Sequence, residues 1–451
     1  MLCDEKAVLI KRRTLGEHLT SVNIFKEYIL PKIRDKINNY TWVDLFAGEG
    51  NLILPILDLV PENKRIEFFH HNIFLFEVQK EMVERAIKNA ESYGIPKSIA
   101  ETNIQIRDTL KEYPVLNVKK PIYHITNPPY LYIGYIAKHK ENFNQLDYFA
   151  RSYKGLQDLY QVALMNDLQN GINQMVYIIP SNFLFGDSVS NLIRMSFLPL
   201  YKIDNAIIFE KKIFENTGVN VVICFFERTN IRNSTIKFKA TKINGEIKER
   251  EYVLSQKNNY RAGSEFNDYI KAQKKNMIKI SYYLTKKEID NNKGENKVLL
   301  LNSKEYKNGE YTKKTFFVND KLYEKIIKNP LFIRTVDTGS ENGKSGLYYI
   351  KETFGTDGIF VDGNTYRTNP IQVFIEPYLS SEQMKQLQLT FNQKLNELRD
   401  ITDSEFMTTY KYSNNGKYTR KYLGLLQAKK LLEVIDIKIK IPEQTHQTKL
   451  L

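Results

Sequence analysis

Apolar runs and amphipathic segments alternate along the first half of the chain. Short apolar runs bounded by turn residues indicate buried strands, whereas apolar residues that recur every three or four positions indicate helices. Strands are predicted at Thr41–Phe46, within Phe68–Glu77, and at Ile104–Asp108, Ile122–Thr126, Met175–Pro180 and Val219–Phe226. Helices are predicted at Val22–Leu30, Asn51–Leu59, Val78–Tyr93 and Asp158–Asn170. This alternation predicts an α/β fold with a doubly wound, mostly parallel sheet.

The pattern changes after Arg228, where short β-like runs rich in Lys, Asn and Tyr replace the regular alternation. Helices are predicted near Ser381–Arg399 and Tyr422–Ile435. A length of 451 residues fits two or three domains. We therefore place a boundary near residues 228–240 and expect two domains, residues 1–228 and a C-terminal α+β domain of residues 229–451.

The net charge of +14 is concentrated in the second half. Residues 1–228 contain 27 basic and 26 acidic residues, which leaves 39 basic and 26 acidic residues in 229–451. A near-neutral first half and a strongly basic second half suggest that catalysis and polyanion binding are divided between them. The alternative is a solvated basic surface that has no partner.

Several classes of protein are disfavoured by the composition. The longest apolar candidate, Asn51–Val60, is short and interrupted, and the charged N-terminus lacks a signal core, so we expect a cytoplasmic protein with no membrane segment. The two cysteines, Cys3 and Cys224, cannot form a disulfide framework or a metal knuckle. The histidines show no metal-binding spacing, and we expect His70 and His71 in a loop or at a strand edge, with no metal site.

The segment Asp44-Leu45-Phe46-Ala47-Gly48-Glu49-Gly50 directly follows a predicted strand. A strand, a glycine turn and a helix place backbone amides at the carboxyl end of a sheet, where nucleotide-like ligands bind. Gly48 and Gly50 allow a backbone approach that a Cβ would block. Glu77 and Asp108 follow at the ends of the next two strands, where carboxylates can accept hydrogen bonds from ribose hydroxyls and an adenine amino group. Otherwise they are helix-cap or surface carboxylates.

A second motif, Asn127-Pro128-Pro129-Tyr130, follows the strand Ile122–Thr126. The side-chain oxygen of Asn127 and the carbonyl of Pro128 can accept both N–H bonds of a planar amine, which favours a pyramidal, more nucleophilic nitrogen. The two prolines make the loop rigid, and Tyr130 offers a face for stacking a base. Outside this context the four residues would be an ordinary turn.

Together and in this order, the two motifs resemble the S-adenosylmethionine-dependent amino-methyltransferases, especially the DNA adenine-N6 enzymes of restriction–modification systems. The resemblance covers about residues 12–228 and implies a Rossmann-like methyltransferase domain. It also implies a donor site built from one set of residues, namely Thr20, Asp44, Phe46, Ala47, Gly48, Gly50, Glu77 and Asp108. Thr20 belongs to a stretch that resembles motif X, although Leu19 and Ser21 stand where the family usually has an aromatic residue and a proline.

The same resemblance implies direct methyl transfer without a metal, with Asn127, Pro128, Pro129 and Tyr130 as the catalytic loop. Tyr130 and Phe214, which resembles the aromatic of motif VIII, would stack on a flipped target base; alternatively Phe214 belongs to the core. Cytosine C5 methylation fits poorly because no Pro-Cys pair is present. The Asn at the start of the motif favours adenine N6 over cytosine N4.

The order of motifs, with the basic half last, resembles the gamma group, which has a C-terminal target-recognition domain. Duplex DNA is the implied partner, and a separate cognate restriction endonuclease would act on the same site. The alternatives are an RNA N-methyltransferase, a protein-glutamine N5-methyltransferase and a non-catalytic DNA-binding subunit. Candidate DNA-binding residues in the basic half are Arg334, Lys344, Lys351, Lys411, Lys417, Arg420 and Lys421. Arginine reads guanine edges, whereas lysine more often contacts phosphate.

Overall fold

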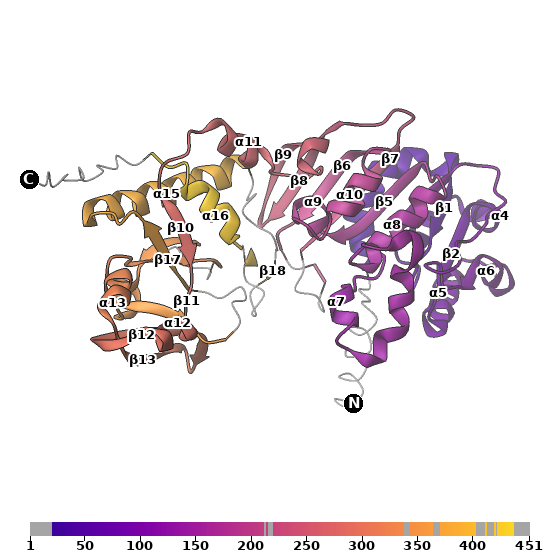
Figure 1. Cartoon of the computed structure of the whole chain (residues 1–451). Helices are drawn as coiled ribbons and strands as arrows, with labels where there is room; N and C mark the ends of the chain where they lie inside the picture. The colour runs from indigo at the N-terminus through magenta and orange to yellow at the C-terminus, as the bar shows by residue number, and fades with distance from the viewer. Residues whose placement is uncertain are drawn as a thin grey trace, which may run out of the picture. The chain divides into compact units, whose positions relative to one another are not determined.

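In a computed structural model, the chain divides into two units (Figure 1). The structure describes residues 20–211, 213–214, 220–337, 343–363, 370–402, 411–412, 419–420 and 422–436. The first unit comprises Met1–Ala262 and Tyr410–Thr419, and the second comprises Gly263–Thr409 and Arg420–Leu451.

The first unit is built on a nine-stranded sheet with the order β3-β2-β1-β4-β5-β7-β6-β8-β9. Strands β3, β2, β1, β4 and β5 are parallel, whereas β7 runs antiparallel between β5 and β6. Their bounds are β1 Thr41–Asp44, β2 Ile73–Glu77, β3 Ile104–Ile106, β4 Ile122–Thr126, β5 Gln174–Pro180, β6 Tyr201–Phe209, β7 Val221–Arg228, β8 Thr235–Asn244 and β9 Glu246–Ser255. The predicted α/β, mostly parallel sheet is confirmed.

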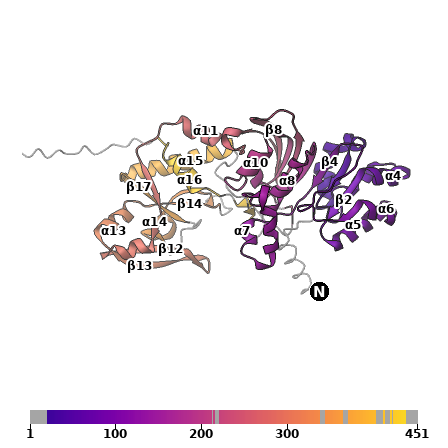
Figure 2. The ribbon, with the colours of Figure 1, turned by 45° about the vertical axis from the view of Figure 1, so that its right-hand side comes forward.

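Helices lie along this sheet: α4, α5 and α6 beside β1–β3, and α8 and α10 beside β5 (Figures 1 and 2). Their bounds are α4 Glu62–Asn72, α5 Lys80–Ser92, α6 Lys97–Asn103, α7 Ile133–Ile136, α8 Leu159–Gln169, α9 Asn182–Phe185 and α10 Asn191–Phe197. The unit also contains short 3₁₀ segments, η3 Leu54–Leu59, η4 Lys140–Phe149, η5 Arg151–Tyr153 and η6 Gln256–Asn258. Neighbouring residues of β1 point to opposite faces of the sheet, so Trp42 joins one buried cluster and Val43 another.

The expected helix at Val22–Leu30 is irregular. It consists of α2 Val22–Ile24, a π-helical turn η1 Phe25–Ile29, α3 Leu30–Ile33 and a 3₁₀ segment η2 Arg34–Asn39. Pro31 lacks a backbone N–H and cannot donate to a carbonyl one turn earlier, so the regular α-helical ladder is interrupted before it. The expected helix at Asn51–Leu59 is likewise reduced to the 3₁₀ segment η3, which carries Pro55 in its first turn.

The expectation for His70 and His71 is wrong, because both lie in the last turn of α4 rather than in a loop or at a strand edge. Within Phe68–Glu77 only Ile73–Glu77 forms a strand. The apolar pair Phe68 and Phe69 is buried as part of an amphipathic helix, whose histidines face outward. A short apolar run therefore belonged to a helix face rather than to an alternating strand.

The first unit runs to Ala262 rather than ending at the expected boundary at Arg228. Strands β8 and β9 follow that boundary, yet β8 pairs in parallel with β6 and β9 pairs antiparallel with β8. A cut after Arg228 would remove two strands from the sheet.

The second unit contains two four-stranded sheets, β10-β17-β14-β15 and β11-β16-β12-β13. Its strands are β10 Lys279–Tyr282, β11 Leu284–Thr285, β12 Lys293–Lys307, β13 Glu310–Val318, β14 Leu331–Arg334, β15 Gly346–Tyr349, β16 Gly358–Val361 and β17 Ile371–Glu376. Its helices are α11 Glu265–Ala272, α12 Lys286–Asn291, α13 Asp320–Ile327, α14 Ile350–Phe354, α15 Ser381–Thr402 and α16 Leu425–Leu432. Two further strands of two residues each pair with each other: β18 Lys411–Tyr412, which belongs to the first unit, and β19 Thr419–Arg420, which spans the sequence boundary between the units. The α+β character predicted for the C-terminal half is thus present, and α15 and α16 lie where helices were predicted.

Candidate functional site: a cavity at the carboxyl ends of the parallel strands

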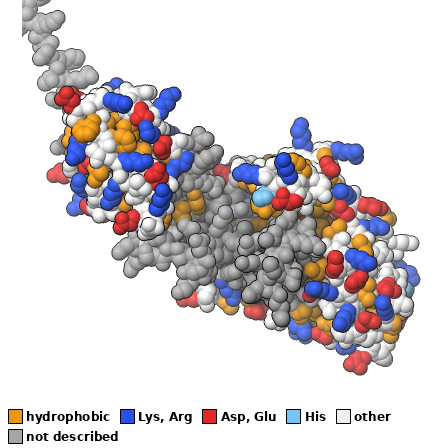
Figure 3. All heavy atoms as spheres, turned by 90° about the horizontal axis from the view of Figure 1, so that it is seen from below, with side chains coloured by type: hydrophobic (Ala, Val, Ile, Leu, Met, Phe, Trp, Pro, Cys, Tyr) orange, Lys and Arg blue, Asp and Glu red, His pale blue; other side chains and the backbone are white. Residues whose placement is uncertain are grey.

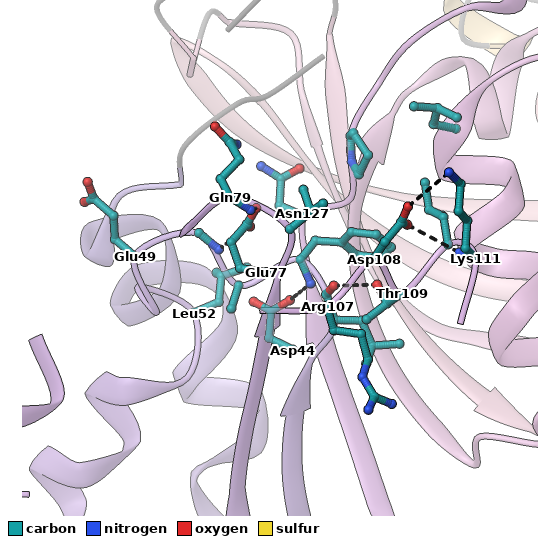
Figure 4. A pocket seen from close by; sticks show the side chains of 18 of the residues that line it. Asp44, Glu49, Leu52, Glu77, Gln79, Arg107, Asp108, Thr109, Lys111 and Asn127 are labelled. Carbon is teal, nitrogen blue, oxygen red and sulfur yellow. Dashed lines mark hydrogen bonds and ion pairs between the residues drawn. The ribbon is translucent and has the colours of Figure 1, made fainter. Parts of the chain in front are cut away.

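A cavity of about 360 Å³ opens where β1, β2, β3 and β4 end. Figure 4 shows Asp44, Glu77 and Asn127 gathered on one side of it and Asp108 with Lys111 on the other. The residues that line it include seven of the eight predicted for donor binding, namely Thr20, Asp44, Phe46, Ala47, Gly48, Glu77 and Asp108. Asn127 and Pro129 of the predicted catalytic loop line the same cavity. Residues separated by about 80 positions are therefore brought together, because parallel strands end at one edge of the sheet.

The glycine turn after β1 has the conformation for which glycine was predicted. Gly48 and Gly50 have positive φ values of 53° and 82°. A Cβ on Gly50 would lie 2.6 Å from Leu54 Cδ1, so only glycine fits without displacing that side chain. Gly50 does not line the cavity; it shapes the turn beneath it.

Glu77 holds this turn in place. The backbone N–H of Gly48 donates to Glu77 Oε2 at 3.0 Å, and the N–H of Gln79 donates to Oε1 at 3.0 Å. The Glu77 side chain is buried and lines the cavity. Each carboxylate oxygen has more than one acceptor site, so Glu77 can support the turn and still accept hydrogen bonds from a ligand.

Asp44 is buried at the floor of the cavity, with an exposed fraction of 1%. Its Oδ1 accepts from the Phe46 N–H at 2.9 Å and from the Thr126 hydroxyl at 2.5 Å. Burial raises the pKa of this carboxyl to about 6, despite these two donors. In the protein without a ligand, burying the ionised carboxylate therefore costs free energy.

Replacing Asp44 by asparagine is expected to stabilise the fold above pH 6. The native carboxyl keeps its proton up to about pH 6, whereas the unfolded group loses it near its ordinary pKa of 3.8. Folding therefore takes up a proton between these values, and the contribution of Asp44 to stability falls as the pH rises through this window. The asparagine amide keeps one acceptor oxygen and carries no charge. Denaturant unfolding should therefore show that the variant gains about 2–3 kcal/mol in free energy of unfolding above pH 6, and gains little below pH 3.8. An equal gain in the free energy of unfolding above pH 6 and below pH 3.8 would contradict this explanation.

Asp108 forms the opposite wall together with η4. The Tyr148 hydroxyl donates to Asp108 Oδ2 at 2.8 Å, and Lys111 lies 3.9 Å from the same oxygen. Gln145, one 3₁₀ turn before Tyr148, also lines the cavity. Its side-chain Oε1 is buried and has no hydrogen-bond partner among the described residues. The contribution of η4 was missed by sequence reasoning; the spacing of Gln145 and Tyr148 by three residues was the available signal.

The Asn127 amide is held from two sides. Its Nδ2 donates to the Thr20 hydroxyl at 2.9 Å, which directs Oδ1 the other way. The Tyr130 hydroxyl contacts both Asn127 Oδ1 and the carbonyl of Ile178. Because a hydroxyl has one proton, Tyr130 donates to only one of these oxygens at a time. Burial raises the pKa of Tyr130 well above its usual value, so it remains a neutral donor.

The rest of the loop is anchored beyond the motif. The N–H of Leu131 donates to Asp158 Oδ1 at 2.9 Å, and Asp158 is the residue that precedes α8. Burial raises the pKa of Asp158 to about 7. The loop is thereby fixed to α8 as well as to β4, an anchor that sequence reasoning did not identify.

A buried network lies beneath both loops. His124 on β4 accepts at Nε2 from the N–H of Leu45, at 3.3 Å, and its Nδ1 lies 2.5 Å from Asp167 Oδ2 on α8. The acceptor role of Nε2 places the ring proton on Nδ1, where it donates to Asp167. Asp167 also accepts from Tyr113 and Tyr177, at 2.7 and 2.6 Å. This network ties the segment that contains the glycine turn to β4, the strand that Asn127 follows.

Phe214 is not among the residues that line the cavity, and the candidate DNA-binding residues belong to the C-terminal half of the sequence. Phe214 is buried, with 5% exposure, in the large core cluster of the first unit. The Arg334 guanidinium lies 4.6 Å from the Tyr348 ring centroid. Lys344 is exposed, and Lys351 pairs with Asp357 at 3.2 Å. Lys417 and Lys421 lie outside the described residues, while Lys411 and Arg420 lie in β18 and β19, where only the backbone is described.

Figure 3 shows one face of the molecule with its basic side chains. On the described part of the face in Figure 3, Lys and Arg lie among acidic and apolar side chains. No group of three His, Cys, Asp or Glu side chains placed to hold a metal ion occurs within the residues that the structure describes. Of the helices in that part of the chain, none has the length and apolar character needed to cross a bilayer.

Comparisons with known proteins place the chain. Residues 12–326 match the family model described as N-6 DNA Methylase. No curated protein matches the sequence significantly. The M protein of the type I restriction enzyme EcoKI is 14% identical, with a TM-score of 0.39, over 50% of this chain and 49% of that one. A type I restriction-modification methyltransferase subunit from Streptococcus thermophilus is 18% identical, with a TM-score of 0.36, over 49% and 46%.

The chain thus spans about half the length of these two solved proteins. The family match is broader, because it includes the glycine turn, the Asn-Pro-Pro-Tyr loop and the whole nine-stranded sheet from β1 to β9. It covers well over half of the 451 residues. The chain therefore belongs to the N-6 DNA methylase family.

Proposed function

We propose that this protein transfers a methyl group from S-adenosylmethionine to the N6 amino group of adenine in duplex DNA. One observation carries the proposal: Asn127 lines the same cavity as Asp44 and Glu77. A loop suited to holding a planar amine therefore adjoins a pocket suited to a nucleotide-like donor. Membership of the N-6 DNA methylase family supports the same reaction.

The cavity fits the donor chemically. Glu77 would accept hydrogen bonds from the ribose hydroxyls, and Asp108 would accept from the adenine amino group. Gln145 would provide a second acceptor on the adenine side, since its buried oxygen lacks a partner among the described residues. When bound, S-adenosylmethionine supplies an electrophilic methyl group that the target amine displaces directly, without a covalent enzyme intermediate.

The residues of the loop prepare the amine. Asn127 Oδ1 and the Pro128 carbonyl would accept its two N–H bonds, which localises the nitrogen lone pair toward the donor. Thr20 accepts from Asn127 Nδ2 and so fixes the amide, while Oδ1, which also contacts the Tyr130 hydroxyl, would accept from the target with its second lone pair. Such preorganised acceptors act without reorganising at the moment of reaction.

An adenine inside a duplex cannot reach a loop that lines a cavity, so the target base would be flipped out of the helix. Tyr130 and Phe214 are proposed to stack on the extrahelical base. Phe214 would first have to leave the core position that it occupies in this structure. The basic residues 229–451 are proposed to bind duplex DNA, with a separate restriction endonuclease acting on the same site.

The reaction is tested by incubating the whole chain with labelled donor and three acceptors: duplex DNA, ribosomal RNA and total protein. We expect label only in duplex DNA, as N6-methyladenine after nucleoside digestion. Label in RNA or in glutamine residues, with none in DNA, would overturn the proposal. Donor binding without transfer to any acceptor would favour a non-catalytic subunit.

Duplex binding by the whole chain is expected to weaken steeply with salt. Each neutralised phosphate contributes a log–log slope of roughly −0.9. Lys344→Ala should lower the magnitude of this slope by roughly the amount expected for one phosphate contact, and it should weaken binding to all DNA sequences alike. Arg334→Ala should instead relax the base preference at a single position of the recognition site. Lys321→Ala, an exposed change on α13, is the matched control. Affinity that does not change with salt would contradict a phosphate-binding role for this half.

A further inference from the structure

A second cavity of the first unit has no place in the proposed reaction. It has a volume of about 860 Å³ and shares no lining residue with the donor cavity. Its lining includes Thr41, the first residue of β1, Asn72, which precedes β2, and Lys120, which precedes β4. It therefore lies at the amino ends of the parallel strands, whereas the donor cavity lies at their carboxyl ends.

Two helical segments form its long walls. On α4, labelled in Figures 1 and 2, the residues Lys64, Glu67, Phe68 and His71 line the cavity. Their spacing of three and four positions places them on one face of the helix. On the other side, η2 contributes residues that include Arg34 and Ile37, which share a face because a 3₁₀ helix repeats every three residues. A groove thus runs along the face of α4.

The groove is strongly basic. Its lining contains four permanently charged cations, Arg34, Lys64, Lys119 and Lys120, and a single carboxylate, Glu67. Within the described part of the chain, Arg34, Lys64 and Lys119 form no ion pair. The half of the sequence that contains them is almost neutral, with 27 basic and 26 acidic residues up to position 228. The excess of positive charge is therefore local to this groove, and it is distinct from the general basicity of the C-terminal half.

Thr41, which lines the same groove, has a buried hydroxyl without a partner among the described residues. Thr41 is 1% exposed, and its Oγ1 has no hydrogen-bond partner among the residues described here. Buried hydroxyls normally have a partner, because leaving one unpaired costs free energy. A polar group of a ligand in the groove would supply it.

The groove also has an apolar part. Leu59 is 43% exposed and Phe74 is half-buried, and both line it beside the buried Phe68. Lys120 Nζ lies 6.0 Å from the Phe68 ring centroid, so a cation and the apolar surface are adjacent. A concave site with apolar walls and a few converging polar groups is typical of small-molecule binding.

We propose that this groove binds a nucleotide, with the phosphates on the four cations and the base on the apolar side chains. Charge-assisted bonds to phosphate need unpaired Lys and Arg, which the groove provides. A nucleic-acid strand is the less suitable occupant, because Thr41 is recessed and a free nucleotide can enter more deeply than a strand held at the surface. This inference is independent of the proposed methyl transfer.

The test is calorimetric titration of the whole chain with adenosine 5′-triphosphate while the donor cavity is saturated with S-adenosylhomocysteine. We expect saturable binding, weaker binding of inorganic phosphate, and an affinity loss of about tenfold or more for the Lys119→Glu, Lys120→Glu double variant. Thr41→Val should bind several-fold more weakly. Lys88→Glu, a charge reversal on an exposed face of α5, should bind like the wild type.

Hydrogen exchange provides a readout that does not need the double variant to fold. Nucleotide should protect peptides from residues 60–74 and 117–122 of the wild type. No binding at saturating S-adenosylhomocysteine, equal affinity in the double variant and in Lys88→Glu, or protection only elsewhere in the chain would overturn the proposal. So would an oligonucleotide that binds to these peptides and is not displaced by the triphosphate.

Discussion

The Asn127→Ala protein is expected to bind the methyl donor and duplex DNA but to transfer methyl groups about 10²–10³-fold more slowly than the wild type. Its missing oxygen is one of two acceptors proposed to hold the target amine. The donor is proposed to be held by other residues of the cavity, chiefly Glu77 and Asp108, so its affinity should change little. Single-turnover transfer to duplex DNA, measured at saturating donor, is the decisive quantity.

Two further variants separate positioning from general damage to the fold. Thr20→Val removes the acceptor of Asn127 Nδ2, which should allow the amide to rotate and give a rate between those of wild type and Asn127→Ala. Asn63→Ala, an exposed change on α4, serves as the matched control and should be fully active. Turnover of Asn127→Ala within a few-fold of wild type would place the amine clamp elsewhere.

The second large effect is expected for Glu77→Ala, which should weaken donor binding by about 10²-fold. Two hydrogen bonds from ribose to a carboxylate would be lost, each contributing about 1.5–3 kcal/mol, with part of the loss offset by water. The Gly48 N–H would also lose its partner, which loosens the glycine turn. Calorimetry with S-adenosylhomocysteine measures the change directly.

Because Glu77 is proposed to act on binding rather than on chemistry, the defect should be seen in the donor KM. Raising the donor concentration should restore turnover, in contrast to Asn127→Ala. Glu77→Gln keeps one acceptor oxygen and should lie between wild type and Glu77→Ala. Glu91→Ala, on the exposed side of α5, should bind normally. Unchanged affinity in folded Glu77→Ala would remove this residue from the donor site.

The local pattern of apolar and polar residues was sufficient to predict much of the fold. Buried parallel strands are short apolar runs, so β1, β4 and β5 could be located from hydrophobicity alone. Where local signals compete, the predictions were less accurate. Phe68 and Phe69 resembled the start of a strand but belong to α4, and Pro31 interrupts a segment whose apolar spacing indicated one regular helix.

The local sequence pattern could not predict the order of the strands in the sheet. Strand β7 lies between β5 and β6, and β8 and β9 extend the sheet beyond the expected boundary. Hydrogen bonds between strands depend on which edges meet, and this information is distributed over the whole chain. The composition changes near Arg228 because β8 alternates buried residues with exposed ones such as Lys237 and Lys239, and because the first part of β9, Glu246–Glu251, is mostly exposed and charged. Both strands nevertheless belong to the same sheet.

The sequence by itself determined the two loops of the candidate site. A glycine turn after one strand and Asn-Pro-Pro-Tyr after another are local features, and loops at the ends of parallel strands must share one edge of the sheet. Only the tertiary structure decided what holds these loops. Thr20 meets Asn127 across 107 positions, and His124 meets Asp167 across 43. The orientation of an amide or an imidazole depends on the partner of each polar atom, and such partners are chosen by packing rather than by neighbouring residues.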